Sequence, residues 1–430
     1  MSLPPAGFEV IRDPLWDNIR LEGAAIAVLD TAAVQRLRYV RQLGHAFLVY
    51  PGATHSRFEH ALGTYHLAKR ALSLLDERGE LAGVSEEERL ATRLAALLHD
   101  VGHYPFSHAL EEAGFARHEL LGVERLEQDD LAHVLAAHGG PGLAAQIAAL
   151  IRGTSSSPVA GLITGSLDLD KIEYLNRDAH MCGVPYGTID VDRLLTSLAL
   201  CEAGPQRWEV GVHEKGVSAL ESLLFAKYQM YRNVYWHHAV RAATCMFKRA
   251  VRTAVAGGTL APEDIARATD GSLMERLLAA DPSGLADAVH GRRLFKRALD
   301  LPASDVPRDA QSWLSDDPDL TAQVEDVLAD AVGLAPGHLL LDFPARSTML
   351  DVDLPLRTRS GTVERLTAAG RRGHLGLPRI AEPLYQSARR LRVFVAESPA
   401  SPLPDLMALV TLPEADVRRR LEKKEALVRV

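Results

Sequence analysis

Histidine and aspartate gather in the stretch LAALLHDVGHYPFSH, residues 94–108, directly after an apolar helical pattern. It contains His99, Asp100, His103 and His108. Imidazole nitrogen and carboxylate oxygen suit a hard or borderline divalent cation, which would also offset the cost of burying Asp100. An unusually polar bend is the alternative, because an isolated His-Asp pair is most often a surface or capping pair. The stretch therefore predicts either a metal site or a polar bend.

Further ligands for such a cation must come from other segments. His60, in HSRFEHALG, and Asp170, in LDLDKIEYLNRD, are the candidates. They would give two His and two Asp ligands and leave positions for water and substrate. Residues four apart on a helix share a face, so His99 and His103 are expected to point the same way before Pro105 disrupts the helix.

The elements that must position these residues are mainly helical. From Asp30, DTAAVQRLRYVRQLG predicts a capped helix that stops at Gly44. Further helices are expected over 56–77, 86–101, 116–126, 129–138, 142–152, 168–180, 190–198, 215–254 and 262–279. Two breaks interrupt them: the loop GTSSSPVAG (153–161), and two β-like runs around AGPQR, a hairpin within a small sheet.

Beyond residue 280 the pattern changes to short β-like runs, which are RRLFKRAL, HLLLDFP and RLRVFVAE. The end, EADVRRRLEKKEALVRV, predicts a charged amphipathic helix. The fold class expected is mainly α, with a helical core, a small hairpin and a minor α+β C-terminal portion. Residues 1–280 are predicted to form the core, and residues 281–430 to make oligomer or regulatory contacts.

Composition narrows the class of protein. The 430-residue chain is 47% hydrophobic and 24% charged, which is typical of a globular protein with a sizeable core. A net charge of −8 gives nucleic acid little bulk attraction, so an anionic ligand must be drawn by a local basic cluster. The three cysteines include no CxxC pair, and neither a leader pattern nor an apolar run of about 18 residues is found. We therefore expect a cytoplasmic protein without a membrane span.

Four stretches carry a resemblance to a known family: DTAAVQRLRYVRQLG, YPGATHSRFEHALGTYHLA, LLHDVGHYPFSH and LDLDKIEYLNRD. In this order, over residues 10–250, they resemble the HD-domain phosphohydrolases, and specifically the deoxynucleoside triphosphate triphosphohydrolase branch. The resemblance implies hydrolysis of a dNTP to a deoxynucleoside and inorganic triphosphate. It implies one divalent cation, of which Mn, Fe, Zn, Ni and Mg are all candidates, with the ligands His60, His99, Asp100 and Asp170.

The resemblance also implies a catalytic group. His118, in ARHELLG, matches the family's catalytic histidine beside the α-phosphate. Glu111 and His108 are then expected to orient His118 or to relay a proton. Without the resemblance, His118 would be a surface helix residue.

One predicted helix carries several substrate contacts. Asp170, Tyr174 and Asp178 stand at i, i+4 and i+8 and share a face, with Lys171 adjacent. By resemblance, Lys171 and Tyr174 contact the nucleotide, and Asp178 holds the sugar 3′-hydroxyl together with Gln42. Without it, Lys171 and Asp178 would be ordinary surface charges.

Other segments complete the expected substrate site. Arg57 resembles a phosphate contact, and His103 is counted among the substrate-binding residues. Lys227 stands where relatives more often have Arg, so the charge remains but the bidentate fork is lost. Tyr235 and Leu43 match residues that crowd the sugar 2′ position, which favours deoxyribose. The stripe Phe225, Tyr228, Tyr231 and Tyr235 could equally be core packing.

A second nucleotide site is implied between subunits. Asp30, Gln35 and Arg38 match contacts to an activating guanine nucleotide with Mg, and Arg292 and Lys296 match residues that hold its phosphates. The match is broken at two positions, because Glu9 and Arg12 replace Lys and Asn of the regulated relatives. We therefore expect a homo-oligomer, dimer or tetramer, and a capped helix start with a solvated Arg38 as the alternative.

Two rival functions remain open on the sequence. The first is an HD phosphohydrolase of another nucleotide, such as a monophosphate or a cyclic or signalling nucleotide. The second is a nucleotide-sensing or nucleic-acid-binding scaffold that keeps the HD fold; nucleic acid is not favoured as a partner because the net charge is acidic.

Overall fold

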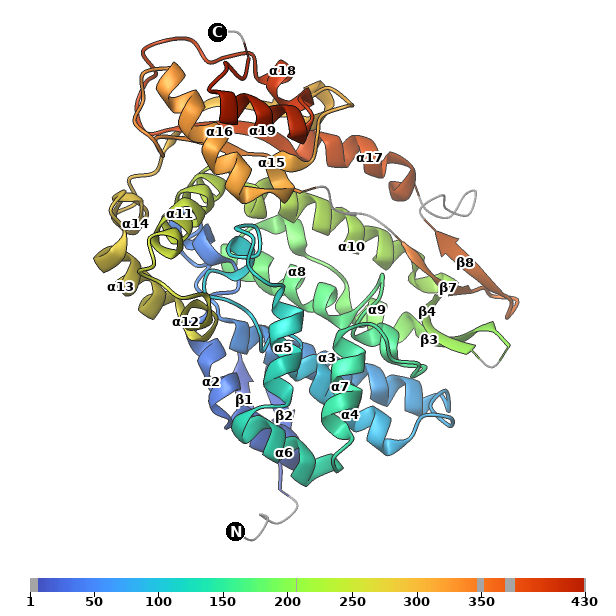
Figure 1. Cartoon of the computed structure of the whole chain (residues 1–430). Coiled ribbons are helices and arrows are strands. Elements are labelled where there is room, and N and C mark those ends of the chain that lie inside the picture. Colours follow the sequence, from blue (N-terminus) through green and yellow to red (C-terminus); the bar gives the residue numbers. More distant parts are fainter. Residues whose placement is uncertain (1–6, 206, 346–351, 368–375, 429–430) are drawn as a thin grey trace.

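Helices dominate the molecule, as the sequence predicted. The computed structural model describes residues 7–205, 207–345, 352–367 and 376–428, and within these residues the strands form only three small sheets (Figure 1). The helices up to residue 256 are α1 (Gly23–Leu29), α2 (Ala32–Gln35), α3 (Arg57–Glu77), α4 (Glu86–Leu98), α5 (His118–Leu126), α6 (Asp129–Gly139), α7 (Leu143–Ile151), α8 (Leu169–Cys182), α9 (Val191–Ser197), α10 (Val217–Met230) and α11 (His238–Ala256).

The helices beyond residue 256 are shorter on average. They are α12 (Pro262–Arg267), α13 (Asp270–Ala280), α14 (Leu285–His290), α15 (Trp313–Asp316), α16 (Pro318–Ala331), α17 (Leu377–Ala388), α18 (Leu406–Thr411) and α19 (Glu414–Lys423). The predicted C-terminal helix thus ends at Lys423, and residues 429–430 of that prediction lie outside the described chain.

The strands confirm the small hairpin and the α+β C-terminal portion. They are β1 (Glu9–Asp13), β2 (Asp17–Leu21), β3 (Leu198–Gly204), β4 (Arg207–His213), β5 (Lys296–Pro302), β6 (Leu339–Asp342), β7 (Asp353–Arg357), β8 (Val363–Thr367) and β9 (Arg390–Val395). The hairpin β3–β4 is extended by β7, which runs parallel to β4, and by β8; residue 206 at its tip lies outside the described residues. The C-terminal sheet has the antiparallel order β5-β9-β6, and β1–β2 is a hairpin that the sequence did not predict.

Two long helices of the core begin at well-defined N-caps. Ser56 caps α3 and Ser85 caps α4, each in a capping box with a Glu three residues later. α3 is buried along most of its length and packs against α4 and α8 (Figure 1).

The predicted helix over 30–44 is wrong. α2 stops at Gln35, a 3₁₀ turn follows at Arg36–Tyr39, and a second 3₁₀ turn runs over Gly44–Leu48. The chain must pass close to the segment that follows the His-Asp pair, because a Cβ on Gly44 would lie 2.8 Å from the carbonyl oxygen of Phe106. Gly44 also has a left-handed φ of 49°, which suits glycine.

Two other predicted helices are broken. The helix expected over 215–254 is divided into α10, a π-helical turn at Tyr231–Tyr235, and α11. The helix expected over 262–279 is divided into α12 and α13, because Thr269 caps the second piece. Apolar periodicity continued across both breaks, so the sequence pattern did not reveal them.

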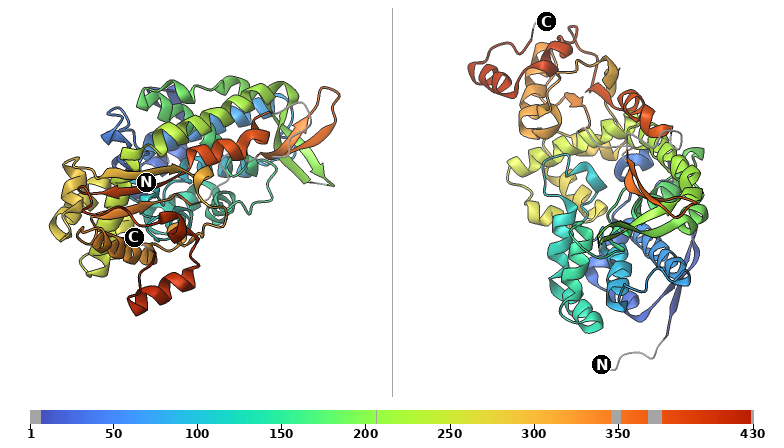
Figure 2. Two further views of the ribbon diagram at one scale, coloured as in Figure 1. Left: turned by 90° about the horizontal axis from the view of Figure 1, so that it is seen from above. Right: turned by 90° about the vertical axis from the view of Figure 1, so that its right-hand side faces the viewer.

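The C-terminal portion packs on the core through α11 (Figure 2). Arg241 of α11 lies 2.7 Å from Asp342 of β6 and 2.8 Å from Glu112, in the segment after the His-Asp pair. The boundary at residue 280 stays a prediction. Among the described residues, no single helix is long and apolar enough to span a membrane; the segments 130–139 and 143–151 pass such a test only as a pair bent by 108°.

A buried histidine gives the fold a specific dependence on pH. His45 stacks on Phe106 with ring centroids 4.6 Å apart, and neither ring nitrogen has a hydrogen-bond partner among the described residues. Burial, together with the charge of Arg41, lowers the pKa of His45 to about 3. In the unfolded chain His45 has an ordinary pKa of about 6.5. Below that pH the unfolded chain therefore binds a proton at His45, and the folded chain does not.

We predict that the free energy of unfolding decreases as the pH falls from 6.5 towards 3, and that His45→Phe removes this contribution. The free energy of unfolding of the variant minus that of wild type should be about 2 kcal/mol larger at pH 5 than at pH 8. Urea unfolding of both proteins at the two pH values measures it. A difference that is the same at pH 5 and pH 8 would contradict the assignment.

Candidate active site

Three separated helices bring together a cluster of metal-ligating side chains. His60 lies in the first turn of α3, His99 caps the end of α4, and Asp170 lies in the first turn of α8. His60 Nε2 is 3.2 Å from His99 Nε2 and 3.0 Å from Asp170 Oδ1, and His99 Nε2 is 3.6 Å from the same oxygen. One ligand atom from each of the three lies within 4.8 Å of the others.

Hydrogen bonds at Nδ1 of the two imidazoles determine which way their Nε2 atoms point. His60 Nδ1 donates to Glu173 Oε2 at 2.5 Å, and His99 Nδ1 donates to the carbonyl oxygen of Ala96 at 2.9 Å. When both rings are neutral, as metal binding requires, each carries its lone pair on Nε2, and the two Nε2 atoms face each other. This is the arrangement of metal-ligating histidines, whose second nitrogen is held by a carboxylate or a carbonyl. The donor set fits a divalent cation.

The cluster attracts positive charge. Burial alone would lower the pKa of His60, but the charge of Glu173 and the hydrogen bonds that His60 donates to Asp170 and Glu173 raise it to about 10. Burial likewise opposes ionisation of Asp170, yet its hydrogen bonds with His60 and His99 hold its pKa well below the usual range. A cation would therefore compete with protons for these atoms, because metal ligands must be deprotonated.

Asp100 lies beside the cluster rather than within it. Its carboxylate is 3.5 Å from His99 Nε2 and 3.7 Å from His60 Nε2. Arg57 Nη1 contacts Asp100 Oδ2, the oxygen that also faces His60, and Arg57 Nη2 contacts Ser107 Oγ. Burial opposes ionisation of Asp100, but the charge of Arg57 lowers its pKa well below the usual value.

A second group of side chains adjoins Asp100. His103, His108, Glu111 and His118 each offer a ligand atom within 4.8 Å of the others, so this group could also hold a cation. His118 Nδ1 donates to Glu111 Oε1 at 2.5 Å, and Glu111 Oε2 lies 3.1 Å from His108 Nδ1. Glu111 thus contacts both His118 and His108, and the hydrogen bonds of these two histidines lower the pKa of Glu111 against the effect of burial.

The expectation that His99 and His103 share a helix face is wrong. α4 ends at Leu98, three residues before the end of the predicted helix 86–101, and a turn follows. His103 instead stacks on His118 with ring centroids 3.7 Å apart, and its Nε2 lies 3.3 Å from Asp100 Oδ1. Asp100 therefore stands between the two groups.

Two of the predicted sugar contacts, Asp178 and Tyr235, touch each other directly. Asp178 accepts a hydrogen bond from the Tyr235 hydroxyl at 2.7 Å and lies 2.8 Å from His55 Nε2. The rings of Tyr174 and Tyr235 lie edge to face, with centroids 6.4 Å apart. Burial and the charge of Asp178 raise the pKa of Tyr235 well above its ordinary value, so its hydroxyl remains a donor.

The remaining predicted substrate residues have contacts of their own. Lys171 Nζ contacts Asp168 and donates to the carbonyl oxygen of Gly165 at 2.7 Å. Lys227 Nζ lies 6.0 Å from the centre of the Tyr231 ring. Gln42 is buried, and its backbone carbonyl oxygen lies 3.5 Å from Arg57 Nη2. Leu43 packs against the small cluster of Ala46, Ala53 and Val240.

The aromatic stripe on α10 divides. Tyr228 is buried in the core, and Tyr231 and Tyr235, in the π-helical turn that follows α10, pack against that core. Phe225 is 44% exposed, and its ring centroid lies 6.0 Å from that of Tyr228. The core-packing alternative therefore holds for Tyr228 but not for Phe225.

The predicted activator residues fall into two places. Gln35 accepts from Arg38 Nε at 2.8 Å and donates to the carbonyl oxygen of Leu29, and the Arg38 guanidinium stacks on Phe58 at 3.6 Å. Asp30 is the exposed cap residue at the end of α1. Arg292 donates to the carbonyl oxygen of Leu48 at 2.8 Å, and Lys296 begins β5 on the surface.

Sequence reasoning missed the residues that hold the ligands. Glu173 and Arg177 are fully buried on α8, where Arg177 donates to Glu173 at 2.7 Å and lies 3.0 Å from Asp13 of β1. His55, beside Asp178, was missed as well. The spacing of Asp170, Glu173 and Arg177, at i, i+3 and i+7 on one helix, was a signal that could have identified Glu173 and Arg177.

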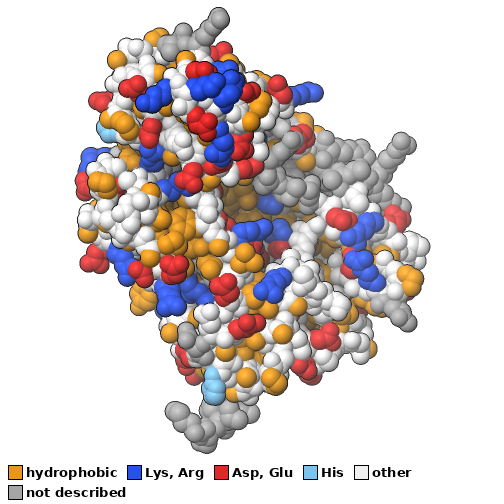
Figure 3. Space-filling model, in the orientation of Figure 1, with side chains coloured by type: hydrophobic (Ala, Val, Ile, Leu, Met, Phe, Trp, Pro, Cys, Tyr) orange, Lys and Arg blue, Asp and Glu red, His pale blue; other side chains and the backbone are white. Residues whose placement is uncertain are grey.

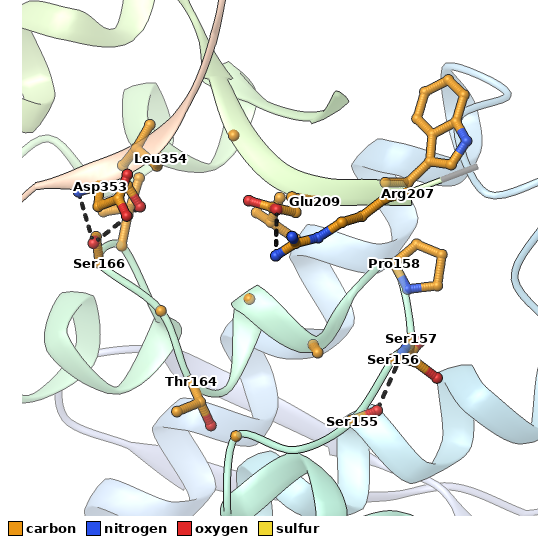
Figure 4. Close-up of a pocket in the computed structure, with 18 of the residues that line it drawn as sticks. Ser155, Ser156, Ser157, Pro158, Thr164, Ser166, Arg207, Glu209, Asp353 and Leu354 are labelled. Atoms are coloured by element: carbon orange, nitrogen blue, oxygen red, sulfur yellow. Dashed lines mark hydrogen bonds and ion pairs between the residues drawn. The ribbon is translucent and has the colours of Figure 1, made fainter. Parts of the chain in front are cut away.

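The molecular surface is hollowed near its centre, and both basic and acidic side chains show in the hollow (Figure 3). A separate cavity of about 460 Å³ lies between the loop 153–167 and strands β4 and β7 (Figure 4). None of the predicted site residues lines it, and its charged groups pair with one another: Arg365 contacts Asp353 at 2.5 Å, and Arg207 contacts Glu209 at 2.8 Å. This cavity is not part of the candidate active site.

Comparison with known proteins identifies two matching regions. Residues 57–173 match the HD domain, and residues 189–369 match an HD associated region. An uncharacterized protein of Methanocaldococcus jannaschii is 35% identical over 68% of this chain and 59% of its own length. The uncharacterized protein YwfO of Bacillus subtilis is 32% identical over 57% of this chain and 56% of its own length.

A named enzyme and a solved structure are also similar. Deoxynucleoside triphosphate triphosphohydrolase SAMHD1 of Gallus gallus is 27% identical over 76% of this chain and 64% of its own length. A crystal structure of a hypothetical protein from Aquifex aeolicus aligns with a TM-score of 0.68 and 25% identity, over 91% of this chain and 97% of that one. The chain spans less than two thirds of the first three curated relatives.

The chain is a member of the HD phosphohydrolase superfamily, with an HD domain followed by an HD associated region. His99 and Asp100 both lie within the matched HD domain.

Close packing of two glycines sets the distance between Asp100 and His118. A Cβ on Gly102 would collide with the carbonyl oxygen of His118 and the amide nitrogen of Gly122, whereas a Cβ on Gly122 would have its nearest neighbour 3.5 Å away. Gly102→Ala must therefore move α5, and with it His118, away from Asp100.

We predict that Gly102→Ala keeps the bound metal but lowers turnover by about 10²-fold, because displacing a reacting group by about 1 Å can cost that much. Gly122→Ala is the matched control and should behave as wild type. Metal analysis and steady-state rates of both variants measure this. Equal rates in the two variants would show that the glycine contact does not set the position of His118.

Proposed function

We propose that this protein hydrolyses deoxynucleoside triphosphates to a deoxynucleoside and inorganic triphosphate. The observation that carries the proposal is the adjacency of three groups around Asp100: the cluster of His60, His99 and Asp170, the guanidinium of Arg57, and the histidine His118. Hydrolysis of a phosphate ester needs charge stabilisation and a proton for the leaving oxygen, and these groups offer both.

The chain's own residues have distinct roles in the proposed reaction. His60, His99 and Asp170, with Asp100 beside them, would hold a divalent cation, which polarises an α-phosphate oxygen when bound. Arg57 would bind a second phosphate oxygen, moving from Asp100 towards the substrate. His118 would transfer a proton at Nε2, because Glu111 already holds Nδ1.

The proposed sugar site accounts for a preference for deoxyribose. Asp178 would accept a hydrogen bond from the 3′-hydroxyl, with His55 and Tyr235 holding its carboxylate in place. Tyr235 would occupy the space that a 2′-hydroxyl needs. Lys171, Tyr174, His103 and Lys227 are proposed to contact the nucleotide, and Gln42 and Leu43 to close the sugar side.

Regulation by a nucleotide with Mg, bound by Asp30, Gln35, Arg38, Arg292 and Lys296 in a dimer or tetramer, belongs to the same proposal, as does a cytoplasmic location. The support for it is the similarity to deoxynucleoside triphosphate triphosphohydrolases and the contact between Gln35 and Arg38.

The test is a panel of nucleotides incubated with the purified, metal-analysed protein, with products separated by chromatography. Release of triphosphate from a dNTP is the expected result. Only pyrophosphate with dNMP, or only orthophosphate with dNDP, contradicts the reaction. Hydrolysis confined to monophosphates or cyclic nucleotides would favour the alternative HD phosphohydrolase, and no hydrolysis would favour a sensing or scaffold protein.

Two alanine substitutions should separate metal binding from proton transfer. Asp100→Ala is expected to lose metal and activity together, because it removes a carboxylate next to both histidine ligands. His118→Ala is expected to keep the metal and to lose about 10²- to 10⁴-fold in rate, the usual contribution of a proton donor. Metal content and rate are measured on the same samples. Equal loss of metal from both variants would make His118 a ligand.

Selectivity at the sugar should depend on the ring of Tyr235. We expect Tyr235→Ala to narrow the preference for dNTP over NTP by about tenfold, because it opens space near the 2′ carbon. Tyr235→Phe is the control, since it keeps the ring and loses only the hydrogen bond to Asp178. The ratio of kcat/KM for a dNTP and its NTP measures both. If the ratio is unchanged in Tyr235→Ala, the ring serves packing alone.

A further inference from the structure

A buried carboxylate outside the HD domain joins two segments that meet at Arg57. Asp270 is the first residue of α13 and is only 5% exposed. Its Oδ1 accepts a hydrogen bond from the amide of Phe106 at 2.9 Å, and its Oδ2 accepts one from the amide of Arg41 at 3.1 Å. One side chain thus holds the backbone of two loops far from it in sequence.

The first of these loops contains a strained turn. Phe106 and Ser107 are consecutive residues with left-handed φ values of 57° and 62°. Non-glycine residues persist in this conformation only where the surrounding structure holds them there. Ser107 Oγ accepts from Arg57, so the turn determines where the Arg57 guanidinium lies.

The second loop supports Arg57 from the other side. The amide of Arg57 donates to the carbonyl oxygen of Val40 at 2.8 Å, and the carbonyl oxygen of Gln42 lies 3.5 Å from its guanidinium. The loop also touches the turn directly, because Gly44 has no room for a side chain against Phe106. A shift between the two loops would therefore move Arg57.

A second polar link joins the same three segments. The half-buried Arg36 donates through Nη1 to the carbonyl oxygen of Ala268 at 2.7 Å and through Nη2 to that of His103. The start of α13 is thus held to the turn after the His-Asp pair by a cation as well as by Asp270. The two charges also attract each other.

We propose that Asp270 is a positioning residue: it holds the Phe106–Ser107 turn and the Arg41–Gln42 segment together, and so sets the position of the Arg57 guanidinium at the phosphates. The inference rests on the proposed function for its effect on rate, but its effect on the backbone is independent of any activity.

The experiment compares Asp270→Ala with Asp281→Ala in the full chain. Asp281 is a matched control because it follows the other end of α13 and also accepts backbone hydrogen bonds, from Ser283 at 2.9 Å and Ala286 at 2.8 Å. We expect Asp270→Ala to lower kcat by about 10²-fold with the metal content unchanged. Amide hydrogen exchange should become faster in residues 41–44 and 104–108 only, and Asp281→Ala should leave both regions and kcat as in wild type.

A double substitution identifies the route of the effect. If Asp270 acts through the turn, Ser107→Ala should lower the rate in wild type but add little in Asp270→Ala, because coupled residues are not additive. Asp270→Asn, which keeps the shape but turns an amide group towards one of the two N–H donors, replaces Asp270→Ala throughout if the latter does not fold.

The proposal is overturned by unchanged exchange in residues 41–44 and 104–108, by equal loss of kcat in the Asp270 and Asp281 variants, or by full additivity with Ser107→Ala. If the wild type hydrolyses no nucleotide, the proposed function fails, and the exchange measurement alone decides the role of Asp270.

Discussion

The structure depends on negative charge buried where α3, α4 and α8 meet. Asp170 and Asp100 lie within 4 Å of two imidazole nitrogens whose lone pairs face each other, and Glu173 is fully buried behind one of them. Burying a carboxylate is costly unless it is paired. Arg57 pairs with Asp100, and Arg177 with Glu173, while the partly exposed Asp170 faces His60 and His99, which would share a cation with it.

Several segments of the fold contribute partners to these buried charged groups. The N-terminal hairpin contributes Asp13 to Arg177, and the indole nitrogen of Trp16 donates to Glu173 at 2.9 Å. On the opposite side, the HD associated region supplies Asp270 to the turn that holds Arg57. The site is therefore assembled from segments across more than half of the chain, and the HD domain alone does not contain all of its supports.

The sequence identified candidate ligand and catalytic residues more readily than the residues that hold them in place. His99 and Asp100 stood out by composition, Asp170, Tyr174 and Asp178 by helical spacing, and His118 by resemblance. Asp270 could not be found in this way, because a capped helix start such as ATDGSL has the same pattern whether or not its carboxylate reaches another loop. The same holds for His55, whose partner Asp178 is 123 residues away. The breaks in the predicted helices 30–44 and 215–254 depended on tertiary contacts that no local pattern contains.

The most direct test of this account is the position of a bound transition metal. Crystals of the protein grown with Mn²⁺ should give an anomalous difference peak between His60 Nε2, His99 Nε2 and Asp170 when data are collected near the manganese absorption edge. A single peak among His103, His108, Glu111 and His118 instead, or no peak in crystals whose protein contains manganese by elemental analysis, would contradict the assignment of the metal to the first cluster.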